Sequence, residues 1–246
     1  MSGHSKWSTI KHKKGAEDAK RGKIFTKHAK LIAIAARFGG DPDMNPALRS
    51  AIDNARAVNM PRDNIERAIK KGTGESKDGV VMEEIMYEGF APGGVALYIE
   101  ALTDNKNRTV TNIKTVLNKY GGNLGAAGSV GYFFKKHGLI TLDKIGTSME
   151  EIELQAIDAG AEDIREEADV VFVSTQPHDV MKVKKALEER GIAVKSAELT
   201  YSASSTVDVP DAEIAKKVEA IIEKLEEDED ISCVYTNFSG TPPSDA

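Results

Sequence analysis

The segment from residue 139 to residue 201 constrains the fold most, because its apolar residues change periodicity in a fixed order. Short apolar runs predict strands and amphipathic stretches predict helices, so the segment reads strand, helix, strand, strand, helix, strand. The predicted elements are residues 139–142, 149–159, 161–166, 170–174, 177–190 and 194–201. This is the order of a ferredoxin-like split βαβ domain, which we place at residues 134–207.

The stretches on either side of this segment do not each make a core alone. Residues 80–133 predict two strands, 85–90 and 95–102, and a helix from about residue 107 to 120. Residues 211–238 predict a helix, 211–227, and a last strand, 231–238. Together they would form a second α+β layer. We therefore expect one discontinuous domain, residues 78–133 plus 208–246, with the ferredoxin-like domain inserted in it.

Three helices are predicted in residues 1–77, after a basic arm. The first begins near residue 16 and ends at Gly39-Gly40. Its apolar stripe consists of Ile24, His28, Leu31, Ala35 and Phe38. The second helix starts at Pro46 after a candidate N-cap, Asn45, and the third covers residues 61–71. The predicted fold class is therefore α+β and multi-domain, with an N-terminal three-helix domain followed by two α+β domains.

The sign of the net charge changes at the end of the predicted helical domain, near residue 77. Residues 1–77 contain 17 Lys and Arg against 8 Asp and Glu, whereas residues 78–246 contain 16 against 31. The net charge of −6 therefore conceals a basic segment of the kind that binds polyanions. Lys-rich ends are often only solvated, but here the lysines cluster with the one tryptophan, Trp7. This clustering favours a contact with nucleic acid.

Two groups of residues are candidates for that contact. Lys and Arg side chains neutralise phosphates, and Trp or His side chains stack on unpaired bases. Arg108, at the start of a helix after the polar loop 104–107, is a separate candidate for a phosphate. The candidates in the arm and first helix are Lys6, Trp7, Lys11, His12, Lys13, Lys14, Lys20, Arg21, Lys23 and Lys27.

Other kinds of site find no support in the sequence. The histidines have neither neighbouring cysteines nor a regular ligand spacing, so we predict no metal site. The glycines of residues 121–128 follow a helix and lack a GKS or GKT sequence, so we expect a packed connection and not a phosphate loop. The sequence shows no nucleophile with its base, and nothing in it places two carboxylates across a cleft. We therefore predict no enzyme, no cofactor and no small-molecule substrate.

The cysteine count and the hydropathy pattern bear on the compartment. A single cysteine, Cys233, excludes an intrachain disulfide and fits a reducing cytoplasm. No apolar run approaches the roughly 20 residues that a membrane span needs. We expect a cytoplasmic protein without a membrane partner, and a monomer is favoured over an oligomer.

Several strings of the sequence are long enough to be specific. They are SGHSKW at residues 2–7, AKRGKIFTK at 19–27, NMP at 59–61, YEG at 87–89, PGG at 92–94, LTDNKNRT at 102–109 and GSV at 128–130. In these strings the chain resembles the YebC/PmpR-type family of probable transcriptional regulators. Phe-Ala at residues 90–91 departs from the Tyr-Gly expected there. The resemblance implies three domains, the third inserted in the second, and a cytoplasmic, non-enzymatic regulator of gene expression.

Two functions stay open at this point. Bacterial members of the family resembled are described as DNA-binding transcriptional regulators, whereas a mitochondrial relative is a translational activator of cytochrome c oxidase. The sequence lacks an obvious helix-turn-helix pair that combines base-reading Asn, Gln and Arg, which favours RNA slightly. We predict a nucleic-acid-binding regulator, in the first place a DNA-binding transcriptional regulator. The alternative is a translation factor that binds the ribosome through ribosomal RNA.

Overall fold

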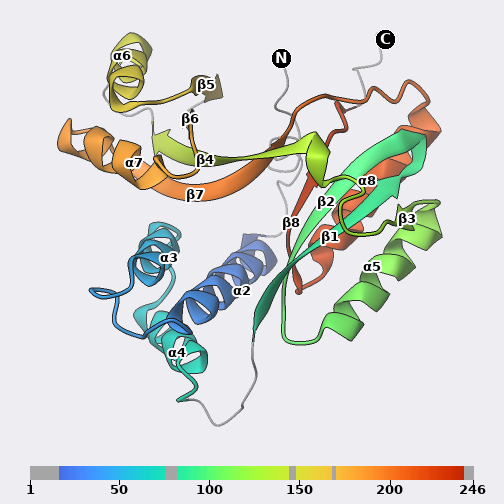
Figure 1. Ribbon diagram of the computed structural model, residues 1–246, viewed down its shortest axis with the longest axis horizontal. Coiled ribbons are helices and arrows are strands. Elements are labelled where there is room, and N and C mark those ends of the chain that lie inside the picture. Colours follow the sequence, from blue (N-terminus) through green and yellow to red (C-terminus); the bar gives the residue numbers. More distant parts are fainter. Residues whose placement is uncertain (1–16, 76–81, 144–147, 168–169, 241–246) are drawn as a thin grey trace.

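A computed structural model describes residues 17–75, 82–143, 148–167 and 170–240 (Figure 1). Helices α2 (Glu17–Ala36), α3 (Pro46–Ala57) and α4 (Arg62–Gly72) form a helical group. Asn45 is the N-cap of α3, as predicted, and its side chain accepts a hydrogen bond from the Leu48 N–H. Both α3 and α4 pack against α2. The apolar core between the three helices includes Ile32, Leu48, Ile52, Ala55, Met60 and Ile65.

Helix α2 ends at Ala36, two residues before the end of the predicted apolar stripe. The prediction that Phe38 belongs to the buried side of this helix was wrong, because the side chain is 85% exposed. Gly39 has a φ of 138°, a conformation that L side chains rarely adopt, and the chain turns away from the helix there. Ile24, at the other end of the stripe, is also exposed.

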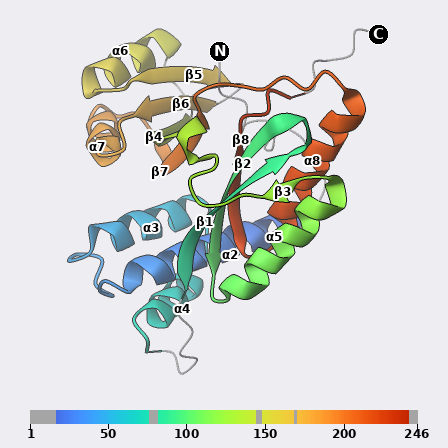
Figure 2. The same ribbon diagram turned by 45° about the vertical axis from the view of Figure 1, so that its right-hand side comes forward.

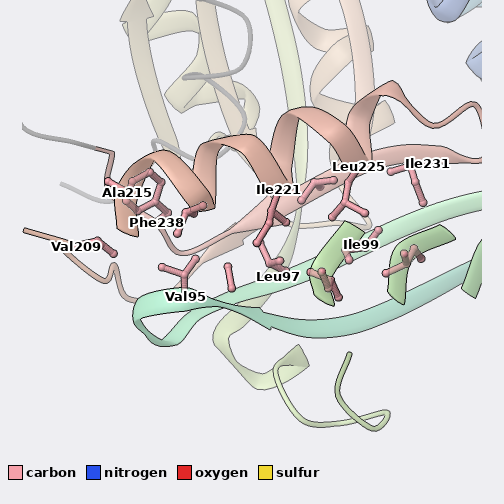
Figure 3. Close-up of a cluster of buried hydrophobic side chains, with 14 of the residues drawn as sticks. Val95, Leu97, Ile99, Val209, Ala215, Ile221, Leu225, Ile231 and Phe238 are labelled. Atoms are coloured by element: carbon pink, nitrogen blue, oxygen red, sulfur yellow. The ribbon is translucent and has the colours of Figure 1, made fainter. Parts of the chain in front are cut away.

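The first sheet contains strands β1 (Glu83–Ala91), β2 (Val95–Thr103), β3 (Asn123–Leu124) and β8 (Ile231–Thr236), in the antiparallel order β3-β1-β2-β8. Helices α5 (Lys106–Tyr120) and α8 (Ala212–Glu227) cover one face of it (Figure 2). Side chains alternate along a strand, so every second residue of β2 points into this core. Figure 3 shows Leu97 and Ile99 of β2 facing Ile221 and Leu225 of α8.

The second sheet contains strands β4 (Phe134–Asp143), β5 (Asp163–Glu167), β6 (Val170–Thr175) and β7 (Val194–Ala203), in the order β5-β6-β4-β7. Helices α6 (Met149–Ala159) and α7 (Val180–Glu189) contribute to its core with Ile152 and Leu187. All three strand pairs are antiparallel. The first strand of this segment lies between the third and the fourth, and the second lies at the edge. This is the ferredoxin-like arrangement that the order of elements predicted.

The connection between the two sheets confirms the predicted fold class. Strand β8 follows the whole second sheet in the chain, yet it pairs with β2, with Leu97 opposite Thr236. The ferredoxin-like segment is therefore inserted between two parts of the first sheet. The chain is α+β, with a helical group before its sheet-containing parts. The domain boundaries at residues 77, 133 and 207 stay a prediction.

Strands β4 and β7 extend beyond the core of the second sheet and reach the first one. There Phe134 and Tyr201 pack against Tyr98 of β2 and Tyr235 of β8. The Tyr98 and Phe134 ring centroids are 5.4 Å apart in a stacked geometry, and those of Tyr201 and Tyr235 are 5.2 Å apart. The sequence placed the start of the first of these strands at residue 139, because the charged residues at 135 and 136 interrupt its apolar pattern.

Candidate nucleic-acid interface

Most of the predicted contact residues lie where the structure describes no side chain. Lys6, Trp7, Lys11, His12, Lys13 and Lys14 lie outside the described residues. Positions 20, 21 and 23 belong to α2, but the side chains of Lys20, Arg21 and Lys23 are also outside the description. Positions 20, 23, 27 and 30 follow one another at intervals of three or four residues, so they share one side of the helix. Lys27 is half-buried on that side.

Helix α2 is fixed to the first sheet by two long basic side chains. The Lys30 Nζ donates to the Glu229 carbonyl oxygen at 2.6 Å and to Asp230 Oδ1 at 3.3 Å. The Arg37 Nη1 donates to the Met82 carbonyl oxygen at 3.1 Å. Both contacts are made at the end of the sheet where β1 and β8 begin. The helix that follows the basic arm is therefore held against the body of the protein.

His28 lies next to this attachment and behaves as a core residue. The side chain is half-buried, and its Nδ1 is buried without a hydrogen-bond partner. Burial and the neighbouring Lys27 charge lower the pKa of His28, while Glu198 on β7 opposes them. The neutral form is favoured, which agrees with the assignment of this histidine to the apolar side of the helix.

Arg108 is part of an ion-pair network that the sequence did not reveal. Its Nη2 lies 2.7 Å from Asp230 Oδ2 and 2.9 Å from Asp104 Oδ1, and its Nε lies 3.0 Å from Asp230 Oδ2. The Thr109 hydroxyl donates to the same Asp230 oxygen at 3.0 Å. Arg108 therefore has a structural role here. A contact between Arg108 and a phosphate stays a prediction.

Asp230 joins three segments that are distant in the chain. It lies directly before β8 and is 5% exposed, and it contacts Lys30 of α2 as well as Arg108 and Thr109 of α5. Burial alone would raise the pKa of Asp230, but the hydrogen bonds from Arg108 and Thr109 and the charge of Lys30 lower it. No local pattern distinguishes this residue from the other acids of the preceding turn, so its role could not be predicted from the sequence.

Helix α4 presents a second group of cations. Arg62, Arg67, Lys70 and Lys71 are exposed along it. Two of them are engaged within the helix, since Arg62 Nε donates to Glu66 Oε1 at 2.9 Å and Arg67 bonds the Asn64 side chain. In Figures 1 and 2 this helix lies at the opposite end of the molecule from α6. The helix therefore offers a basic surface that is remote from the acidic inserted segment.

The connection between α3 and α4 is short. Residues 58–61 form it, and Asn59 has a φ of 59°, the left-handed conformation that Asn tolerates. The Met60 N–H donates to the Ala55 carbonyl oxygen at 3.0 Å, and the Met60 side chain is buried. A turn of this length between two helices is typical of helix-turn-helix motifs.

The glycine-rich connection at residues 121–128 leads into backbone that binds a carboxylate of the protein itself. Glu88 of β1 accepts hydrogen bonds from the N–H groups of Gly128, Val130 and Gly131, at 2.8, 2.6 and 2.9 Å. Burial opposes ionisation of Glu88, but these bonds lower its pKa. Three N–H groups at the end of this connection and just after it are thus already paired with a carboxylate of the protein. This agrees with the expectation of a packed connection.

Two observations on metal binding and on membrane spans concern only the part of the chain that the structure describes. Within residues 17–75, 82–143, 148–167 and 170–240, no three His, Cys, Asp or Glu side chains are grouped so that they could hold a metal ion. No helix in these ranges is both long and apolar enough to cross a membrane. Cys233 is buried in β8.

Two models of known protein families match the sequence of this chain. A model of the TACO1/YebC N-terminal domain matches residues 5–75, and a model of the TACO1/YebC second and third domains matches residues 82–238. The chain belongs to the TACO1/YebC family. The resemblance found in the sequence strings is thereby confirmed.

Relatives of TACO1/YebC type cover nearly the whole chain. A protein of Treponema denticola is 53% identical over 97% of this chain and 96% of its own length, and one of Halothermothrix orenii is 50% identical over 97% and 95%. Both carry the name "probable transcriptional regulatory protein". The crystal structure of a conserved hypothetical protein from Aquifex aeolicus superposes with a TM-score of 0.88 at 44% identity. The superposition covers 98% of this chain and 100% of the Aquifex aeolicus chain.

Proposed function

We propose that the chain is a nucleic-acid-binding regulator of gene expression that acts without catalysis, and that its target is DNA. The observation that carries the proposal is the division of charge, with 17 Lys and Arg against 8 acids in residues 1–77 and 16 against 31 in the rest. A basic segment on an acidic body confines phosphate binding to one end of the molecule. The names of the relatives support a regulatory role.

The helical group supports DNA as the target. The four-residue turn between α3 and α4, with its left-handed Asn59, has the length of a helix-turn-helix connection. In that motif the second helix enters the major groove. Here the second helix is α4, whose exposed Arg and Lys residues suit a phosphate-lined groove. The arm would then follow the backbone beside it.

One observation favours ribosomal RNA as a second candidate target. Specific readout of a base pair in DNA needs Arg, Asn or Gln side chains that are free to form paired hydrogen bonds. The guanidinium groups of Arg62 and Arg67 are both engaged inside α4, with Glu66 and Asn64. A surface of this kind suits recognition by backbone and shape, as in structured RNA. A ribosome-binding translation factor is therefore the alternative function.

Competition binding separates the two targets. A fluorescent DNA duplex is bound to the protein at about 0.1 M salt and displaced with unlabelled duplex DNA or with ribosomal RNA of equal nucleotide concentration. The proposal predicts that DNA competes at least as well as RNA and that promoter fragments compete better than random ones. Stronger competition by RNA, together with co-sedimentation of the protein with ribosomes, would establish the alternative.

A further inference from the structure

The loop between α2 and α3 carries the most exposed apolar side chains of the described residues. Phe38 is 85% exposed and Met44 is 83% exposed, more than any other large hydrophobic residue in those ranges. We call residues 37–44 the apolar loop. Exposing two such side chains on one short segment is unfavourable, since apolar surface gains free energy when it is removed from water. A bound partner that covers them would recover it.

The apolar loop is built rigidly. The buried side chain of Asn45 donates through Nδ2 to the carbonyl oxygens of Ala35 and Gly39, both at 2.9 Å, while its Oδ1 caps α3. Arg49 donates to the carbonyl oxygens of Pro42 and Asp43 at 3.0 and 2.9 Å. The loop is tied to both helices that it connects. The backbone that carries the exposed side chains is therefore held in place, so binding through them orders little additional backbone.

The surroundings of the loop are basic. A Cβ at Gly40 would lie 2.7 Å from the Thr73 Cγ2, so the loop packs against the end of α4. The last turn of that helix carries the exposed cations Lys70 and Lys71. The loop also carries two acids, Asp43, which lies 3.6 Å from the Arg49 guanidinium, and Asp41, which accepts the Asp43 N–H. They are outnumbered by the cations Arg37, Arg49, Lys70 and Lys71 of the loop and the helices next to it. Exposed apolar side chains on a loop that packs against a lysine-bearing helix end suit a base next to its phosphates.

A protein partner fits these surroundings less well. Phe and Met are enriched in protein–protein interfaces, but lysine and aspartate are depleted there, and the loop and the adjoining helix end carry Asp41, Asp43, Lys70 and Lys71. Another exposed apolar pair of this chain, Leu154 and Ile157 on α6, is flanked by Glu153 and Asp158. The acids beside that pair would repel phosphates, whereas the lysines near the apolar loop would attract them.

The position of the loop extends the proposed interface along α2. The basic arm precedes the first residue of this helix and the apolar loop follows its last residue. The helix has 20 residues and is therefore about 30 Å long. One turn of a B-DNA duplex measures roughly 34 Å. The start of α2, which the basic arm precedes in the sequence, and the apolar loop therefore lie about one helical turn of DNA apart.

We propose that Phe38 and Met44 bind a nucleobase that has left its stack, with Phe38 lying against the base and Lys70 and Lys71 near the adjoining phosphates. Aromatic and apolar side chains stabilise unpaired bases and kinked steps in this way. The inference rests on the proposed function and deepens it, since it assigns a preference for distorted or unpaired nucleic acid.

The test compares two probes, a perfect duplex and the same duplex with one bulged 2-aminopurine, each prepared as DNA and as RNA. Binding is measured by anisotropy between 50 and 300 mM salt, and insertion by the fluorescence of the 2-aminopurine. The variants are F38A/M44A and a matched control, L154A/I157A, which removes exposed apolar area from the acidic segment. Both pairs are exposed, so circular dichroism should show that the variants fold.

The wild type and the control should bind the bulged probe more tightly than the perfect duplex. F38A/M44A should lose that preference, with affinity for the bulged probe falling roughly 5- to 150-fold. The slope of log affinity against log salt should not change, because no phosphate contact is removed. Equal binding of the bulged probe by the wild type and F38A/M44A would overturn the inference and leave the proposed function intact. Absence of binding by the wild type to every probe would overturn both.

Discussion

Replacement of Asp230 by Asn should destabilise the protein, because this one carboxylate neutralises cations from two segments. The substitution keeps the size of the side chain but removes its charge, which leaves Lys30, with a side chain only 16% exposed, without its counterion. Removing one partner of a fully buried ion pair costs about 3–5 kcal/mol. Arg108 is half-exposed and retains Asp104, so the expected loss in the free energy of unfolding is smaller, about 2–3 kcal/mol.

Thermal unfolding followed by circular dichroism measures this loss. For a chain of this size, 1 kcal/mol corresponds to about 2–4 °C, so Tm should fall by roughly 5–10 °C at pH 7. The matched control is D104N, which removes a more exposed partner of the same Arg108. It should shift Tm by much less, since exposed pairs contribute about 0–1 kcal/mol.

The pH dependence gives an independent check on the same residue. The pKa of Asp230 is lowered in the folded protein, so its stabilising contribution is present above the unfolded value of about 3.9 and is lost as pH falls through the folded pKa. The difference in Tm between wild type and D230N should therefore be constant near neutral pH and disappear in acid. Equal Tm values at pH 7, or a larger shift for D104N than for D230N, would refute the account of this network.

Two further substitutions test the helical group. N45A removes the cap of α3 and the two hydrogen bonds to the carbonyl oxygens of the preceding segment. Urea denaturation should therefore show a loss of about 2–3 kcal/mol in the free energy of unfolding. The control N118A, at an exposed position of α5, should have little effect. G72A places a Cβ 2.7 Å from the Cβ of Ala36, so it should separate α4 from α2 and lower Tm. The control G22A adds a Cβ with nothing within 4 Å and should raise Tm slightly, because alanine favours a helix more than glycine does. The opposite order of the two glycine variants would contradict the close crossing of these helices.

Local signals explain why most elements could be predicted from the sequence. The start of α3 is marked by Asn45 and Pro46, and the end of α5 by Gly121, whose φ of 84° only glycine adopts readily. The ferredoxin-like order is likewise a property of consecutive segments. The insertion followed from an argument about cores, because neither flanking stretch could bury its apolar face alone.

What the sequence missed depends on contacts between distant residues. Asp230 and Arg108 are separated by 122 positions, and no periodicity links them. Strand β4 begins at Phe134 because its ring stacks on Tyr98 of the other sheet, which compensates for the charged residues that follow it. Phe38 fitted the helical spacing of α2 but lies beyond the end of the helix. In each case tertiary geometry overrode a local pattern.

The salt dependence of binding tests the central claim most directly. The affinity of the full chain for a DNA duplex is measured by anisotropy from 50 to 300 mM salt. The same measurement is made on the arm variant K11E/K13E/K14E and on the control K114E/K182E/K217E, which reverses the charge of three exposed lysines of the acidic body. If about six to eight phosphates are contacted, the log–log slope is roughly −5 to −7, and the arm variant should reduce its magnitude by about 3. The control should keep the wild-type slope. Equal slopes for all three proteins, or a larger change for the control than for the arm variant, would contradict the assignment of nucleic-acid binding to the N-terminal arm.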